Sequence, residues 1–294
     1  MTKKVLVIGG SGFIGSYIVK KCLKLNWKVY STYYKKKIKN DRVNSFFLDL
    51  SNLKIPKKFN IYYDHVFFSA GDIDHEDQNS KKVLNEHFYS ILELTNKLKT
   101  KNFYYFSTAD EYKNTKQKLD EIKSKISPKT YYALAKHLAS QYLLTLHKKC
   151  IFNVIIFRVF IVYGPGQNTY RFIPNIISNL LKKKKFKILN SNFKKDFLFI
   201  DDFINAIFLS IKNKKLFGKI INVGSGKSIS LNYLGKKIQS IIKQGKVIFK
   251  NENKTKSLSQ FSSIDLIKKN TNWKPKVNLN EGLIKTINYY RKNG

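Results

Sequence analysis

The sequence predicts an α/β protein built on a doubly wound parallel sheet, with a smaller C-terminal α/β lobe. Two patterns in its 294 residues support this fold class. Short apolar runs alternate with segments of helical periodicity through the first half of the chain, which is typical of parallel strands joined by crossover helices. A glycine-rich turn at residues 9–15 also joins the first apolar run directly to the first helical segment.

Strands are expected in the first half of the chain at residues 5–8, 28–32, 45–48, 65–69, 103–107 and 153–159. The chain between them is long enough for crossover helices, of which the clearest are 13–25, 84–98 and 131–147. After residue 166 the alternation loosens into a helix at 172–185, short strands and two further helices. We therefore expect one domain at residues 1–165, to which the chain returns around 196–226, and a second lobe formed mainly by residues 166–294.

The formal net charge of +37 would favour a nucleic-acid partner if it formed one basic face. Lysines spread along the whole chain carry almost all of this charge, since the arginines are only Arg42, Arg158, Arg171 and Arg291. We interpret the lysines as solvated and expect no nucleic-acid partner.

The protein is expected to be cytoplasmic. No apolar run reaches the roughly 18 to 20 residues that span a bilayer, and the first residues enter the first strand directly, so neither a membrane partner nor a signal peptide is expected. Cys22 and Cys150 lack metal-ligand spacing, as do the histidines. We expect two buried thiols rather than a disulfide, and no metal site.

Gly9, Gly12 and Gly15 lie between the first strand and the first helix. Glycine permits positive φ angles in a tight turn, and its missing side chain lets backbone N–H groups approach phosphate oxygens closely. The following helix directs its positive N-terminal end at the same place. The spacing G-x-x-G-x-x-G differs slightly from the commoner dinucleotide fingerprint. In this context it predicts a pyrophosphate site on a Rossmann-like sheet.

Tyr132 and Lys136 stand four residues apart on the helix expected at 131–147, and therefore on one face. A phenol normally ionises near pH 10, and a neighbouring ammonium lowers that value, so the pair could act as an acid/base near neutral pH. Thr108 follows the strand expected at 103–107. Its hydroxyl could bind the same substrate oxygen as Tyr132, or it could simply cap the next turn.

Taken together, these motifs resemble the extended short-chain dehydrogenase/reductase family, which contains NAD(P)-dependent nucleotide-sugar epimerases, dehydratases and 4-keto reductases. The resemblance runs nearly end to end. Further matching motifs are Asp49-Leu50, Ala70-Gly71, Asn85, Ser107-Thr108, Arg158, Val162-Tyr163-Gly164-Pro165-Gly166-Gln167, Lys195-Asp196-Phe197-Leu198-Phe199-Ile200-Asp201-Asp202, Asn222-Val223-Gly224-Ser225-Gly226, Trp273-Lys274-Pro275 and Glu281-Gly282-Leu283.

The resemblance implies a role for each matched position. Tyr132 would exchange a proton with the sugar while the nicotinamide exchanges hydride, Lys136 would hold the nicotinamide ribose, and Thr108 would orient the reacting oxygen. The implied cofactor contacts are Gly9, Ser11, Gly12, Phe13, Ile14, Gly15, Asp49, Leu50, Ala70, Gly71, Tyr132 and Lys136. The implied substrate contacts are Thr108, Ala109, Asp110, Arg171, Asn175 and Lys195. A homodimer through the helices at 84–98 and 131–147 is implied as well.

Departures from the family pattern refine these expectations. Members that use NAD usually carry a carboxylate where this chain has Tyr33, which is followed closely by Lys35, so NADP is favoured over NAD. The dehydratases carry an Asp-Glu pair where this chain has Ala109 and Asp110, which argues against dehydration. Lys195 replaces the usual arginine, and cannot bind a phosphate through a bidentate fork.

The leading hypothesis is therefore an NADP- or NAD-dependent enzyme that transfers hydride at C4 of a nucleotide sugar, with a preference for a 4-keto reductase. One alternative is a 4-epimerase with tightly bound NAD. The other is a non-catalytic cofactor-binding or RNA-associated protein. His137, next to Lys136, points about 100° away from it on a helix, so a packing or surface role is expected for it.

Overall fold

The computed structural model describes residues 2–71, 80–113, 115–250 and 259–293. By its internal contacts the chain forms two compact units. The first, called here the sheet unit, contains Met1–Lys113, Lys125–Arg158 and Ser210–Ile221; the second unit contains Asn114–Ser124, Val159–Leu209 and Asn222–Gly294. These boundaries differ from the expected division near residue 165, because residues 114–124 and 159–165 belong to the second unit.

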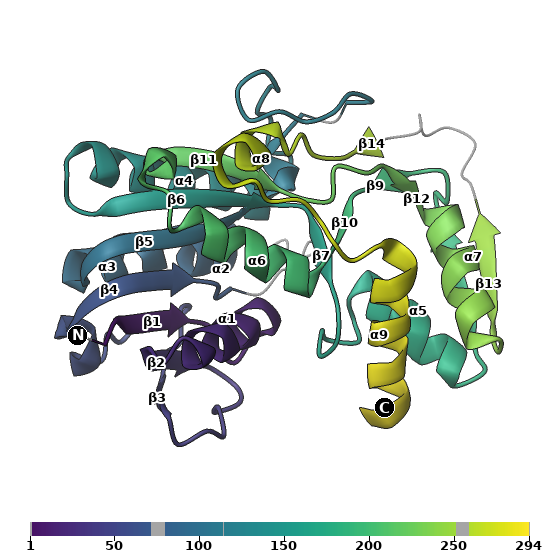
Figure 1. Ribbon diagram of the computed structural model, residues 1–294, viewed down its shortest axis with the longest axis horizontal. Coiled ribbons are helices and arrows are strands. Elements are labelled where there is room, and N and C mark those ends of the chain that lie inside the picture. The colour runs from purple at the N-terminus through teal and green to yellow at the C-terminus, as the bar shows by residue number, and fades with distance from the viewer. Residues whose placement is uncertain (1, 72–79, 114, 251–258, 294) are drawn as a thin grey trace. The chain divides into compact units, whose positions relative to one another are not determined.

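A seven-stranded sheet forms the centre of the sheet unit, in the order β11-β6-β5-β4-β1-β2-β3 (Figure 1). β1 pairs in parallel with both β2 and β4, and the parallel pairing continues to β3 on one side and β5 on the other. The predicted doubly wound sheet is thus confirmed. Its strands are β1 (Lys4–Ile8), β2 (Lys28–Tyr33), β3 (Val43–Phe47), β4 (Tyr62–Phe68), β5 (Lys99–Thr108), β6 (Asn153–Val159) and β11 (Lys219–Val223).

Helices cover both faces of this sheet. Leu6 and Ile8 of β1 share a buried cluster with Leu94 of α3 and Leu143 of α4. Successive strand residues point to opposite faces, so Val5 and Val7 face the other side, which α1 covers in Figure 1. The helical elements of this unit are α1 (Phe13–Lys24), η1 (Lys57–Asn60), α2 (Ser80–Leu84), η2 (Asn85–Tyr89), α3 (Ser90–Lys97), η3 (Ala109–Glu111), α4 (Tyr131–Lys148) and η4 (Lys214–Leu216).

Several expected boundaries were wrong. β5 begins at Lys99, before the expected residue 103, because Thr100 and Asn102 are polar but buried: the Thr100 hydroxyl donates to Tyr63 O at 3.0 Å and the Asn102 amide to Asp64 O at 2.8 Å. The helix expected at 84–98 contains one π-helical stretch, η2, between two α-helical parts.

The second unit contains short strands and longer helices. β7 (Ile161–Tyr163) pairs in parallel with β10 (Phe197–Phe199), and β8 (Lys185–Leu189) with β13 (Lys246–Lys250). β9 (Lys194–Lys195) lies between β12 (Ile229–Ser230) and β14 (Ser259–Gln260). The helices are α5 (Phe172–Leu181), α6 (Ile200–Ser210), α7 (Leu231–Ile242), α8 (Asp265–Thr271) and α9 (Leu279–Asn293).

Helix α5 ends at Leu181, four residues before the expected end at 185. Lys183 has a φ of 56°, which a right-handed helix cannot accommodate, so the chain leaves the helix within the lysine run. Within the described ranges, no helix has the length and apolar character needed to cross a membrane.

Candidate active site

The glycine turn connects β1 to α1 through close backbone contacts. Gly9 has a φ of 84°, and its carbonyl accepts a 3.0 Å hydrogen bond from Gly12 N. A Cβ added to Gly15 would lie 2.2 Å from Gly9 O, so α1 can approach the turn only without a side chain there. Gly12 is the N-cap of α1 and has no side chain to cap it. The turn therefore directs the first N–H groups of α1 outward, in the arrangement that binds phosphates elsewhere.

The residues expected around the adenosine half of the cofactor follow the ends of β2, β3 and β4. Tyr33 ends β2, and its ring packs edge-on against Phe47 at 6.1 Å, while Lys35 is exposed. The Asp49 carboxylate accepts hydrogen bonds from the Ser51 hydroxyl at 2.7 Å and backbone N–H at 2.9 Å, which lower the pKa of Asp49.

Beside them lie Leu50 and the residue pair after β4. Leu50 and Ala70 pack against the sheet core. Gly71 has a φ of 114°, and a Cβ there would lie 2.2 Å from the His87 ring. These positions are therefore shaped by close packing at the carboxyl ends of neighbouring parallel strands, where such sheets bind ligands.

Tyr132 and Lys136 lie one turn apart on α4 and are both buried. The Lys136 ammonium nitrogen is 5.8 Å from the centre of the Tyr132 ring and 4.8 Å from that of Tyr105. It donates a 3.0 Å hydrogen bond to Phe106 O, which ties α4 to β5. Burial lowers the pKa of Lys136 to about 7, and the negative charge of Glu111 opposes that shift. The charged and the neutral form of the Lys136 amine are therefore both accessible near neutral pH.

Thr108 is the last residue of β5, two residues beyond the carbonyl that Lys136 binds. Its hydroxyl oxygen accepts a 3.2 Å hydrogen bond from Asp110 N and donates one of the same length to the Asp110 carboxylate. Thr108 thus caps the turn that contains Ala109, as the alternative expectation had it. Its contact with a substrate oxygen remains a prediction.

The remaining expected substrate contacts belong to the second unit. Arg171 precedes α5, with its guanidinium 5.1 Å from the Tyr170 ring centre. The Asn175 side-chain oxygen accepts a 2.7 Å hydrogen bond from the Asn179 amide. Lys195, on β9, donates at 2.7 Å to the side-chain oxygen of Gln260. These polar groups are held by their own unit, and their role toward a substrate remains a prediction.

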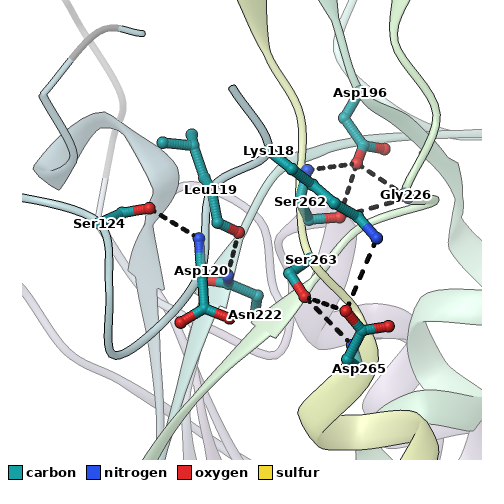
Figure 2. A network of polar contacts seen from close by, with 10 residues as sticks. All are labelled: Lys118, Leu119, Asp120, Ser124, Asp196, Asn222, Gly226, Ser262, Ser263 and Asp265. Atoms are coloured by element: carbon teal, nitrogen blue, oxygen red, sulfur yellow. Dashed lines mark hydrogen bonds and ion pairs between the residues drawn. The ribbon is translucent and has the colours of Figure 1, made fainter. Parts of the chain in front are cut away.

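Asp196, next to Lys195, joins three segments of the second unit that are distant in sequence (Figure 2). Its buried carboxylate accepts hydrogen bonds from the backbone and hydroxyl of Ser225, both at 2.6 Å, and from those of Ser262, at 3.1 and 2.7 Å. Gly226 N donates to it at 3.0 Å. Two motifs noted in the sequence, 195–202 and 222–226, are thereby connected through one carboxylate.

A family model for the NAD-dependent epimerase/dehydratase family matches residues 5–224, which is more than half of the chain. The chain belongs to this family. The resemblance inferred from the motifs is confirmed, and the protein is an enzyme of the NAD-dependent epimerase/dehydratase family. Its match extends from β1 into the Asn222–Gly226 motif and includes the glycine turn, Thr108 and the Tyr132–Lys136 pair.

Curated relatives in the epimerase/dehydratase family cover this chain at moderate identity. Human dTDP-D-glucose 4,6-dehydratase is 27% identical over 321 residues, which cover 99% of this chain and 91% of that protein. UDP-glucuronate 4-epimerase from Thermodesulfobacterium geofontis is 29% identical over 220 residues, covering 74% of this chain and 66% of that protein.

The fold also matches a solved structure of a mutant UDP-glucuronic acid 4-epimerase from Bacillus cereus, in complex with UDP-4-deoxy-4-fluoro-glucuronic acid and NAD. The TM-score is 0.86 at 21% identity, with 99% of this chain and 100% of that chain covered. At this identity the likeness establishes the fold that the epimerase/dehydratase family shares.

Beyond the expected residues, this member of the epimerase/dehydratase family has a buried carboxylate that the motifs did not indicate. Glu111, at the end of η3, is fully buried and accepts hydrogen bonds from Arg158 at 2.8 Å and from His137 at 2.9 Å. His137, for which a packing or surface role was expected, is thus a polar partner of Glu111. One signal in the sequence could have indicated such a carboxylate. Arg158 lies within an apolar strand, and an arginine buried there needs an acidic partner.

Proposed function

We propose that this chain is a nucleotide-sugar 4-epimerase that transfers hydride at C4 of its substrate and retains NAD(P) between turnovers. The observation that carries the proposal is the buried Tyr132 phenol beside the buried Lys136 ammonium, which hydrogen-bonds Phe106 O two residues before β5 ends at Thr108. The name of the relative from Thermodesulfobacterium geofontis supports 4-epimerisation. Ala109 supplies no carboxylate for the dehydration that the human relative is named for.

The glycine turn and the first turn of α1 fit a pyrophosphate, because Gly12 leaves the helix N-terminus without a side-chain cap. They would hold NAD(P), which supplies the hydride acceptor and donor. Tyr132, as the phenolate, would take the proton of the C4 hydroxyl and later return it to the oxygen of the C4 ketone. Lys136 would favour the phenolate through its positive charge, and Thr108 would hydrogen-bond the same oxygen.

Replacing Tyr132 by phenylalanine tests this assignment. Tyr132→Phe should lower epimerisation by at least about 100-fold, the low end of what a positioned acid/base contributes, and should leave NAD(H) affinity unchanged. Tyr131→Phe is the matched control, because the neighbouring Tyr131 is half exposed and should tolerate the loss of its hydroxyl. Epimers would be separated by chromatography from a panel of UDP, GDP, CDP and dTDP sugars, chosen by thermal-shift screening. Full turnover by Tyr132→Phe would refute the proposal.

A 4-keto reductase that uses NADPH is the second candidate. The observation in its favour is that β2 ends in Tyr33, where a carboxylate would repel a 2′-phosphate, and that the exposed Lys35 follows. A reductase consumes one cofactor per product, whereas an epimerase shows no net redox change. Copurification of NAD(H), with no net absorbance change at 340 nm during turnover, would exclude the reductase; stoichiometric NADPH consumption would establish it.

We also propose a homodimer that pairs the faces of η2 and α4. Tyr89, Tyr131, Leu134 and Leu138 are between one third and one half exposed on these two helical segments. Large apolar side chains gathered on a helix face favour a protein partner. Light scattering should give twice the chain mass of 34.4 kDa, and Leu138→Glu should reduce it to a monomer.

A further inference from the structure

A buried carboxylate that contacts His137, the residue after Lys136, has no role in the mechanism above. Glu111 has a fully buried side chain and lies three residues after Thr108, at the end of η3. One of its oxygens accepts hydrogen bonds from the guanidinium of Arg158 on β6 and from the ring of His137 on α4. The other accepts from the Ser107 hydroxyl on β5. One side chain thus joins four elements of the sheet unit.

The hydrogen bond from His137 connects this carboxylate directly to the helical turn that carries Lys136, and Ser107 and Ser140 pack against the same turn. The Ser140 hydroxyl lies 3.2 Å from Ser107 Oγ and donates at 2.8 Å to Lys136 O. The backbone carbonyl of Glu111 also accepts a 2.8 Å hydrogen bond from Ser127 N, which lies on the segment leading into α4. Glu111 therefore restrains both the segment that leads into α4 and the turn of α4 from which Lys136 binds β5.

The charge of Glu111 acts on the same amine. Among the described residues, the rings of Tyr105 and Tyr132 lie close to the Lys136 nitrogen, and the Glu111 carboxylate, which is hydrogen-bonded to Arg158, acts on the amine through its charge. Burial lowers the pKa of Lys136 and the negative charge of Glu111 raises it again. Burial also opposes the charged form of Glu111, but the hydrogen bond from His137 and the charge of Arg158 outweigh it and hold the Glu111 pKa below its ordinary value.

We propose that Glu111 is a positioning residue that keeps the Lys136 amine charged and aimed at Tyr132, while Arg158 sets the strength of its field. The effect on turnover rests on the proposed function, whereas the effect of Glu111 on the charge of Lys136 does not. Loss of the carboxylate would remove the anion that raises the pKa of Lys136 and would leave the positive charge of Arg158 without its carboxylate partner, and both changes favour the neutral amine. Loss of Arg158 would have the opposite effect, because the hydrogen bonds from His137 and Ser107 still favour the ionised Glu111 carboxylate, whose field at Lys136 would then be unopposed by the Arg158 cation.

The test compares Glu111→Gln with Arg158→Met, each with and without Lys136→Met. In each background, the lysine form and its Lys136→Met counterpart are unfolded with urea from pH 5 to 10. The difference between their unfolding free energies begins to rise at the pH where the folded amine loses its proton. Glu111→Gln should move this onset to lower pH by about one unit, and Arg158→Met should move it to higher pH. The proposal requires that the onset moves in opposite directions in the two variants. Structural damage alone would not depend on whether the removed charge was negative or positive.

The activity arm uses the pH profile of kcat/KM. Its alkaline limb should move to lower pH in Glu111→Gln and to higher pH in Arg158→Met. At a pH above the alkaline limbs of wild type and variant, a one-unit shift lowers kcat/KM of Glu111→Gln by about tenfold. An onset that stays in place, or that moves in the same direction in both variants, overturns the proposal. If Glu111→Gln does not fold, the comparison of Arg158→Met with Arg158→Met/Lys136→Met still tests the proposal. An onset that does not move to higher pH in this comparison contradicts the role of the Glu111 charge. A wild type without turnover would refute the proposed function and leave the stability arm valid.

Discussion

Replacing Gly15 by alanine should separate α1 from the turn that precedes it. The added Cβ would lie 2.2 Å from Gly9 O and 2.7 Å from Gly10 Cα, both of which are backbone atoms. An ordinary contact begins near 3.4 Å, so the helix and the turn must move apart by about 1 Å. Side-chain rotation cannot relieve this contact.

The magnitude follows from two opposing effects. Overpacking of a close contact costs about 1–3 kcal/mol, while alanine gains about 1 kcal/mol over glycine in a helix interior. Because the clash is with backbone on both sides, the upper part of the first range applies. The expected net loss in unfolding free energy is therefore about 1–2 kcal/mol.

Urea denaturation followed by circular dichroism, together with NAD(H) binding followed by fluorescence, would measure both consequences. Gly12→Ala is the matched control, because a Cβ there meets only Gly9 O, at 3.2 Å, and its φ of −75° is open to any residue. The control should keep its urea midpoint but lose NAD(H) affinity, whereas Gly15→Ala should lose both. An unchanged midpoint for Gly15→Ala would refute the packing argument.

Three further changes have definite expected outcomes. The pKa of Lys136 falls from 10.5 to about 7 on folding, so between these pH values the unfolded chain binds one proton more than the folded chain. In urea titrations, the unfolding free energy of the wild type relative to Lys136→Met should therefore rise from pH 7 to 10 and stay level below pH 7. Asp196→Ala removes an acceptor of five hydrogen bonds from described residues and should lower the unfolding free energy by about 3–5 kcal/mol in the same measurement. A loss below about 1 kcal/mol would contradict the role of Asp196 in connecting the three segments. Cys150 is exposed, so its expected burial was wrong, while Cys22 is buried and its burial raises the pKa of its thiol. A maleimide should therefore label one thiol in the native protein and two in urea, and two native labels would be the contrary result.

Local patterns were informative where a position depends on neighbours in the sequence. The glycine turn, the alternation of strands and helices and the four-residue spacing of Tyr132 and Lys136 all follow from the geometry of a strand, a turn or a single helix. They were enough to predict the doubly wound sheet and the family. The patterns failed to predict the start of β5, where polar residues are buried. Thr100 and Asn102 look like loop residues in the sequence, but their hydrogen-bond partners lie on the neighbouring strand β4.

The environment of the Lys136 amine could be known only from the tertiary structure. Glu111, His137 and Arg158 come from three different elements, and no spacing in the sequence indicates that they meet. Periodicity specifies which face a residue occupies on its own helix or strand, whereas burial and electrostatic fields depend on groups that folding brings together from distant parts of the chain. The placement of Tyr132 and Lys136 on one helix face was therefore predicted from the sequence, whereas the burial and the neighbouring charges that set the ionisation of the Lys136 amine were decided by packing.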